Sequence, residues 1–364
     1  MTIQEVIQSL EEIAPLQYAE DFDNVGLLVG NSQFQVSNVL VTLDTTEEVV
    51  QEAIEKECNL IVSFHPIIFS GLKKLTGKTY VERAVLKAIQ NDIAIYAIHT
   101  ALDNSQVGVN YQICQQLGLV NQRILLPKKE ILHQLYVYVP EKNAEELRKN
   151  LFQAGAGHVG KYDLCSFNLV GEGTFRPTEG SNPTIGTHSV AHTEKEVKIE
   201  VLVPAHVTDK VIEAMRKNHP YEEIAYGLIA LENENQTVGM GMIAELPEEM
   251  NEHDFMDRLK DLMKTPLIRH SKLLNKKIKK VAVLGGSGVF ATRSAIAQKA
   301  DVFISADFKY HDFFAAENKI VLMDIGHFES EQFTKNLLTT FISKKFTNFA
   351  VYNSEINTNP VNYY

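Results

Sequence analysis

The sequence predicts an α/β protein, with two similar α/β lobes forming one domain and an α+β domain inserted between them. Short β-branched runs alternate with helical periods near both ends of the chain, as in a parallel sheet crossed by helices. Between these ends one strand–helix unit occurs twice, which indicates an internal repeat. We place lobe one at 1–128, the insert at 129–240 and lobe two at 241–364.

The first lobe alternates strands with helices. The runs 38–43 ("NVLVTL"), 59–64 ("NLIVSF") and 93–98 ("IAIYAI") are short and apolar, and helix-like stretches lie at 46–57 and 79–91. Continuous apolar runs of this length favour strands buried on both faces. A parallel sheet is therefore expected here.

The insert repeats a single plan. Residues 135–157 ("LYVYVPEKNAEELRKNLFQAGAG") and 199–220 ("IEVLVPAHVTDKVIEAMRKNHP") each read as a strand, a Val-Pro stop and an amphipathic helix. A further strand-like run follows each unit, so we predict a ferredoxin-like domain built from a doubled β-α-β unit. Residues 176–196, rich in Gly, Pro, Ser and Thr, are the expected loop between the units.

The strand pattern returns in the second lobe. Strands are predicted at "KKVAVLGG" (279–286), "DVFISAD" (301–307), "KIVLMD" (319–324) and, after a helix at 329–344, "NFAVYNS" (348–354). The turn "LGGSGVF" (284–290) has the glycines of a phosphate-binding loop but lacks the lysine of a Walker motif. We interpret its glycines as packing residues, with anion binding as the alternative.

Composition excludes several classes of protein. With 45% apolar and 22% charged residues, and no run of about 18 apolar residues, a membrane protein is not expected. The net charge of −11 argues against nucleic acid as a partner. Cys58, Cys114 and Cys165 form no paired pattern, and the first residues lack the basic region of a secretory signal, so we expect a cytoplasmic protein.

Reactive side chains follow the predicted strands. Ligands bind where parallel strands end, and these positions hold Asp44, His65, His99, Asp307, and Asp324 with His327. Two histidines have a carboxylate four residues later, in the pairs His99 with Asp103 and His327 with Glu331. On a helix such a pair shares one face.

Imidazole with carboxylate suits zinc, iron, manganese or nickel, so these residues predict a site for one or two divalent ions. The alternative is that each pair is a surface helix contact worth a few tenths of a kcal/mol. Asp307 and His311 are candidates for proton transfer beside such ions, or they belong to a capped helix start with exposed charges.

These motifs together resemble the NIF-three-like family, whose members are also labelled GTP cyclohydrolase I type 2 homologs. The matching stretches are "FDNVGLLVG" (22–30), "SFHPIIF" (63–69), "HTALDNSQVGVN" (99–110), "HPYEEIAY" (219–226), "ADFKYHD" (306–312) and "DIGHFESE" (324–331). The resemblance implies a dinuclear metal site between two lobes, a PII-like insert and a ring-shaped homo-oligomer, often a hexamer. By position it assigns the metal ligands His65, His99, Asp103, His327 and Glu331, with Glu331 as the bridge.

One position departs from the family pattern. The family usually has two adjacent histidines before the proline, whereas this chain has Phe64 and then His65. A phenyl ring cannot coordinate an ion. We therefore expect one tightly bound ion and a second with an incomplete shell.

Two classes of function follow from these expectations. The first is a metal-dependent hydrolase acting on a small phosphorylated or nucleotide-like compound. The second is a non-enzymatic metal-binding, regulatory or metal-delivery protein. The motif "NHPYEEIAY" (218–226) in the insert is interpreted as a structural helix-to-strand junction.

Overall fold

The computed structural model describes residues 1–364, in two compact units. Residues 1–127 and 237–364 form the main unit, and residues 128–236 form the inserted unit. Three sheets alternate with helices along the chain, which confirms the expected α/β class. None of the helices combines the length and apolar character that a membrane crossing requires.

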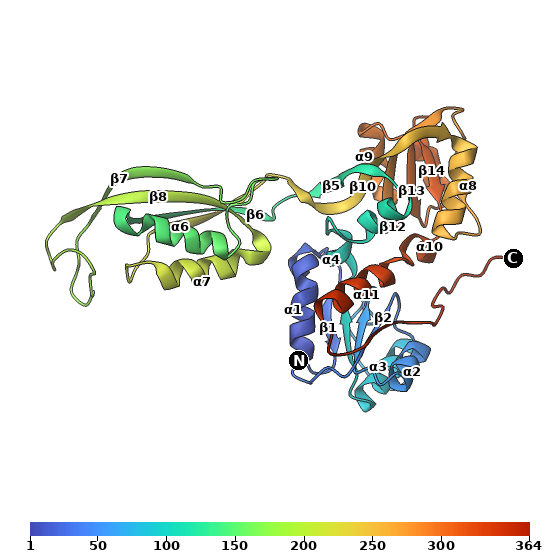
Figure 1. Cartoon of the computed structure of the whole chain (residues 1–364), viewed down its shortest axis with the longest axis horizontal. Helices are drawn as coiled ribbons and strands as arrows, with labels where there is room; N and C mark the ends of the chain where they lie inside the picture. The colour runs from blue at the N-terminus through green and yellow to red at the C-terminus, as the bar shows by residue number, and fades with distance from the viewer. The chain divides into compact units, whose positions relative to one another are not determined.

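The first sheet of the main unit has five strands in the order β1-β4-β3-β2-β15. Strands β2, β3 and β4 run parallel and β1 is antiparallel to β4. Helices α1 and α11 cover one face, and α2 and α3 cover the other (Figure 1). The bounds are β1 Gly26–Val29, β2 Val39–Thr42, β3 Leu60–Ser63, β4 Ala94–Ala97, β15 Val351–Asn353, α1 Ile3–Ile13, α2 Glu47–Glu55, α3 Tyr80–Gln90 and α11 Thr334–Lys345.

The second sheet of the main unit has six strands in the order β11-β14-β13-β12-β10-β5. Its centre is parallel, because β12 pairs with β13 and β13 with β14 in that sense. The strands are β5 Val120–Lys128, β10 Asn235–Asn251, β11 Arg269–His270, β12 Lys277–Ser287, β13 Val302–Ala306 and β14 Val321–Asp324, accompanied by α5 Val109–Gln116, α8 Glu252–Met263 and α9 Thr292–Ala297.

The two halves of the chain exchange strands between these sheets. Strand β15, which the sequence groups with the C-terminal strands, pairs in parallel with β2 of the first sheet. Conversely β5, from the N-terminal half, lies at the edge of the second sheet. The helix expected at 329–344 is divided into α10 (His327–Glu331) and α11. Each half therefore completes the sheet of the other.

The inserted unit contains a four-stranded antiparallel sheet in the order β7-β8-β6-β9. Helices α6 and α7 pack on one face of it (Figure 1). Alternate residues of β6 and β8, such as Val137 and Ile199, are buried against Leu147 and Met215 of the helices, as the period of a half-buried strand requires. The bounds are β6 Leu132–Pro140, α6 Ala144–Gln153, β7 Phe167–Phe175, β8 His192–Pro204, α7 Thr208–Asn218 and β9 Tyr226–Leu231.

Candidate metal centre

Polar side chains from both sheets of the main unit meet where the parallel strands end. His65 follows β3, and His99 opens the short helix α4 (His99–Asp103) after β4. From the second sheet, His327 and Glu331 lie at the two ends of α10, directly after β14. Because α10 is one helical turn, these two side chains share a face.

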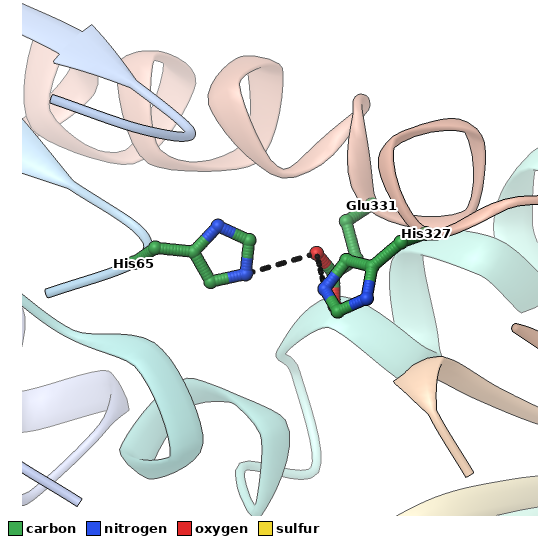
Figure 2. Close-up of side chains that lie close together, drawn as sticks. All are labelled: His65, His327 and Glu331. Carbon is green, nitrogen blue, oxygen red and sulfur yellow. Dashed lines mark ion pairs between the residues drawn. The ribbon is translucent and has the colours of Figure 1, made fainter. Parts of the chain in front are cut away.

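Glu331 lies between two imidazoles. Its Oε2 atom is 3.2 Å from Nε2 of His65 and 3.3 Å from Nε2 of His327. Figure 2 shows both rings directed at the same carboxylate oxygen. The ligand atoms of His65, His327 and Glu331 all lie within 4.8 Å of one another. Residues far apart in the sequence thus converge on one point.

Buried carboxylate oxygens remain unsatisfied at this point. Oε2 of Glu331 has no hydrogen bond of ordinary geometry, although two ring nitrogens are near it, and Oδ1 of Asp103 has no partner either. A buried acceptor without a donor costs free energy. A cation held by His65, His327 and Glu331 would satisfy Oε2 of Glu331. The donor set therefore fits a metal ion on the geometry of the protein itself.

Each of the three imidazoles is paired with a carboxylate through its Nδ1 atom. The pairs are His65 with Asp44 (2.9 Å), His99 with Asp23 (2.8 Å) and His327 with Asp307 (2.7 Å). A carboxylate on Nδ1 fixes the tautomer of the ring and leaves Nε2 as the basic nitrogen, which is the usual arrangement around metal-bound histidine. The role of Asp23, in the quoted stretch 22–30, was not identified from the sequence.

The cluster attracts positive charge. Burial alone would lower the pKa of His65 and His327, but the surrounding carboxylates outweigh it and raise the pKa of these rings to about 10 and about 11. Burial and the charge of Glu331 raise the pKa of Asp103 well above its ordinary value. The buried carboxylates thus attract positive charge, which either protons on these groups or a bound cation can supply.

The remaining predicted ligands lie beside the cluster. The ring of His99 is 5.2 Å from that of His65 between centroids, and Asp103 interacts electrostatically with Glu331 and His65. Phe64 is fully buried, with its ring 5.6 Å from that of His99. It occupies core space and offers no ligand atom where the family pattern has a second histidine.

A glycine turn supports Glu331 from behind. Gly286 has φ +67°, and a Cβ atom there would lie 2.4 Å from Oε1 of Glu331. The amides of Gly285 and Gly286 donate to Asn110 and Ser330, at 3.0 and 2.9 Å. Because these two amides already have partners, neither is free to bind an anion, and Gly286 packs directly against Glu331.

A cavity of about 480 Å³ adjoins the cluster. Asp307 borders it and adopts φ +60°, a left-handed conformation that Asp tolerates better than most residues. His311 is not among the lining residues; its exposed ring contacts Tyr310 and Phe314 instead. The lining residues are Leu43, Asp44, His65, Leu267, Arg269, Asp307, Asp324, Gly326, His327, Phe328, Glu329, Asn359, Pro360, Val361 and Tyr363.

The C-terminal segment also contributes to this site. Thr358 donates a hydrogen bond of 2.7 Å to Oδ2 of Asp44, and Asn359 donates one of 3.1 Å to Glu329. Residues 359–361 form part of the cavity wall. No residue pattern in this segment indicated such a role.

Comparisons with known proteins find similarity along nearly the whole chain. A family model described as Duf34/NIF3 (NGG1p interacting factor 3) matches residues 1–360. A Halalkalibacterium halodurans protein named GTP cyclohydrolase 1 type 2 homolog is 39% identical over 362 residues, which cover 98% of this chain and 97% of that protein. A Bacillus subtilis protein of the same name is 37% identical over 366 residues, with 98% and 97% covered.

Solved structures show the same extent of similarity. The crystal structure of a Bacillus cereus protein related to NIF3 has a TM-score of 0.87 and 37% identity, covering 100% of this chain and 99% of that one. Staphylococcus aureus protein SA1388 has a TM-score of 0.78 and 32% identity, with the same coverage. The similarity therefore includes the inserted unit.

Proposed function

The chain belongs to the Duf34/NIF3 family, and from its buried histidine–carboxylate cluster we propose that it binds a divalent transition metal and hydrolyses a small phosphorylated or nucleotide-like compound. One observation carries the proposal. The buried Oε2 of Glu331 makes no hydrogen bond of ordinary geometry, while the Nε2 atoms of two imidazoles lie 3.2 and 3.3 Å from it. Zinc, iron, manganese and nickel all accept this donor set.

The roles of the residues follow from their contacts. His65, His327 and Glu331 hold the first ion, and His99 with Asp103 supplies an incomplete shell for a second. Such ions, when bound, lower the pKa of a coordinated water and polarise a phosphoryl oxygen. Asp44 and Asp307 keep the Nδ1 protons of His65 and His327 in place.

Proton transfer is assigned to Asp307. Its carboxylate lines the cavity and its side chain is 47% exposed, so it can reach both the cluster and a bound compound. The assignment rests on Asp307 and not on His311, because His311 does not line the cavity.

In this proposal the bound metal offsets the carboxylates of the cavity lining, and one basic residue remains for an anionic substrate. Arg269 lines the cavity, its side chain is 50% exposed, and its guanidinium lies 3.2 Å from Asp324. A fixed guanidinium suits a phosphate oxygen. The printed name of the relatives, GTP cyclohydrolase 1 type 2 homolog, also points to a nucleotide-like compound.

The test combines metal analysis with a substrate screen. Purified protein should contain close to one tightly held transition-metal ion, and metal-loaded protein should hydrolyse a member of a panel of phosphomonoesters, phosphodiesters and nucleoside triphosphates. Glu331→Gln should abolish turnover, whereas Glu55→Gln, on the exposed face of α2, should not. Turnover that survives Glu331→Gln would remove the cluster from the mechanism.

A metal-delivery or regulatory role is the second candidate. The side chain of His327 is 40% exposed although Glu331 behind it is buried, so an ion held there has a route to a partner. Delivery predicts transfer of the ion to an acceptor chelator within seconds and no turnover on the panel. Slow release with turnover supports the hydrolase.

We also propose a PII-like insert, a hexameric ring and a cytoplasmic location. The strand order β7-β8-β6-β9 with two helices on one face is that of a ferredoxin-like β-α-β repeat. The free thiols of Cys58 and Cys114 are buried, which suits a reducing compartment. Light scattering during size-exclusion chromatography tests the ring, since a monomer of 40.9 kDa would contradict it.

A further inference from the structure

The inserted unit contains its own pocket, which does not depend on the proposed function of the main unit. Its volume is about 320 Å³, near the lower end of the roughly 300–1,000 Å³ typical of small-molecule sites. It lies between the end of β7, the loop that follows it and the junction between α7 and β9. That junction is the motif "HPYEE" (219–223), which was interpreted from the sequence as structural.

Hydrogen bonds within the unit hold the walls of this pocket. The backbone N–H of Asn182 donates to Oε1 of Glu222 at 2.8 Å, and the hydroxyl of Thr184 donates to the carbonyl of Pro220 at 2.8 Å. The loop is therefore fastened to the junction. A site fixed in this way binds without ordering a loose loop, which reduces the entropic cost of association.

His219 positions Tyr221 without adding charge. Its Nε2–H donates to the carbonyl of Tyr138 at 2.9 Å, and its Nδ1 accepts from the backbone N–H of Tyr221 at 3.1 Å. One nitrogen donates and the other accepts, so the ring is the neutral tautomer. Burial also lowers its pKa. His219 therefore does not neutralise the acids of the pocket.

Glu196 is a buried carboxylate that borders the pocket. Its exposed fraction is only 9%. A Cβ atom at Gly173 would lie 2.1 Å from its Oε2, so the missing side chain of Gly173 provides room for the carboxylate. No Lys, Arg or His side chain forms an ion pair with Glu196. A buried carboxylate without a compensating positive charge carries a substantial desolvation penalty.

The neighbouring hydroxyl of Tyr221 adds no positive charge that would offset this penalty. Oη of Tyr221 is buried and makes no hydrogen bond of ordinary geometry, although burial and the nearby Glu196 raise the pKa of Tyr221. The phenol and the carboxylate thus form a polar pair at the pocket without a cationic partner. A bound donor could serve both groups.

Aromatic rings and further acids surround this pair. The rings of Phe175 and Tyr221 lie 6.1 Å apart between centroids, and both line the pocket. Aromatic faces attract cations that have left bulk water. Glu222 and Glu223 add negative charge to the lining, against a single basic residue, Arg176.

We propose that this pocket binds a small organic cation, a primary amine or a guanidinium compound, whose charged group pairs with Glu196 beside the rings of Phe175 and Tyr221. The cation supplies the positive charge that the buried carboxylate lacks. Its N–H groups can donate to Glu196 and to the oxygen of Tyr221 together.

Isothermal titration calorimetry of the full-length protein with agmatine and with putrescine tests the proposal. Wild type should bind at least one of them. Glu196→Gln should weaken binding by about tenfold or more, because it removes the charge partner of the cation, and Tyr221→Phe should weaken it less. Glu213→Gln, on the exposed face of α7, makes the same charge change in the same unit and should leave affinity unchanged.

Two controls keep the result interpretable. Glu196→Gln removes a buried uncompensated charge, so its melting temperature should not fall; Glu331→Gln tests whether the cations bind at the metal centre instead. Binding that persists in Glu196→Gln, or that is lost in Glu331→Gln, overturns the proposal. Absence of binding by either cation, or binding of ATP or citrate at this pocket, overturns it as well. None of these outcomes decides whether the main unit is a hydrolase.

Discussion

Nδ1 of His65 lies 2.9 Å from Oδ1 of Asp44. The other oxygen of the same carboxylate accepts the hydrogen bond from Thr358, so the C-terminal segment, Asp44 and His65 form a continuous chain that ends at Glu331. The orientation of one candidate ligand is therefore set by residues from both ends of the sequence.

Replacing Asp44 should weaken this series of hydrogen bonds without removing a metal ligand. Asp44→Asn substitutes a neutral amide for the carboxylate that holds Nδ1 of His65, and we expect metal affinity to fall by about 10–100-fold. Competition with a chromophoric chelator measures it. Asp257→Asn, an exposed residue of α8, is the matched control. Equal affinities in both variants would show that Asp44 does not support the site.

A substitution at Gly286 tests the packing against Glu331. In Gly286→Ala the new Cβ would meet Oε1 of Glu331 at 2.4 Å, so the carboxylate must move and metal affinity should fall. Positive φ also adds about 1–2 kcal/mol of backbone strain. Gly160→Ala has φ +58° and no atom within 4 Å of the new Cβ, so it carries strain alone. If both variants keep their metal, the contact with Glu331 does not matter.

Much of this site could be predicted because its signals are local. Apolar runs indicated where β3, β4 and β14 end, and the four-residue spacing from His327 to Glu331 indicated a shared face. The structure places His65, His327 and Glu331 together, although they come from different sheets. Strand ends and helical spacing are properties of short segments, so a single sequence displays them.

Other features depend on partners that no local pattern specifies. Strand β15 follows β14 along the chain, yet it pairs with β2 of the other sheet. The pairing of Asp23 with His99 joins a loop to the first residue of helix α4, 76 positions away. Similarly, Asp307 and His311 share one motif, but only Asp307 lines the cavity, because the direction of a side chain in an irregular segment is fixed by tertiary contacts.

Removing the metal should destabilise the main unit. A ligand that binds only the folded state stabilises it by about 2.7 kcal/mol at a free concentration one hundred times the dissociation constant. Dipicolinate should therefore lower the melting temperature of wild type, and added zinc or manganese should restore it. The Glu331→Gln variant should have the same melting temperature with and without chelator. A wild type insensitive to chelator contradicts the candidate centre.

Phe64 should limit the number of ions. Phe64→His restores the adjacent histidines of the family pattern beside His99. The measured metal content should then rise toward two ions per chain. The cost is a buried aromatic side chain, on the order of 2–4 kcal/mol of unfolding free energy. Phe255→His is the control, because it removes a phenylalanine of α8 that is buried to the same extent. This variant should bind no additional metal. An unchanged stoichiometry in Phe64→His argues that position 64 does not face the ions.

Glu52 anchors the C-terminal segment that reaches Asp44. Its carboxylate accepts hydrogen bonds from the hydroxyl of Ser354 and the backbone N–H of Glu355, and it pairs with Lys56 at 2.8 Å. Burial alone would raise the pKa of Glu52, but these donors outweigh it and hold the pKa below the ordinary 4.5. The folded state therefore favours the ionised form.

The sign of this shift sets the expected pH dependence. A lowered folded pKa contributes stability that is fully present above pH 4.5 and is lost as the pH falls through the folded value. Glu52→Gln should reduce the free energy of unfolding at pH 7 by about 1–2 kcal/mol, and its difference from wild type should shrink below pH 4.5. Urea titrations across this range measure both, with the exposed Glu55→Gln as control. A difference that grows on acidification would mean that Glu52 is held as the neutral acid, and the anchoring of residues 354–358 would then require another cause.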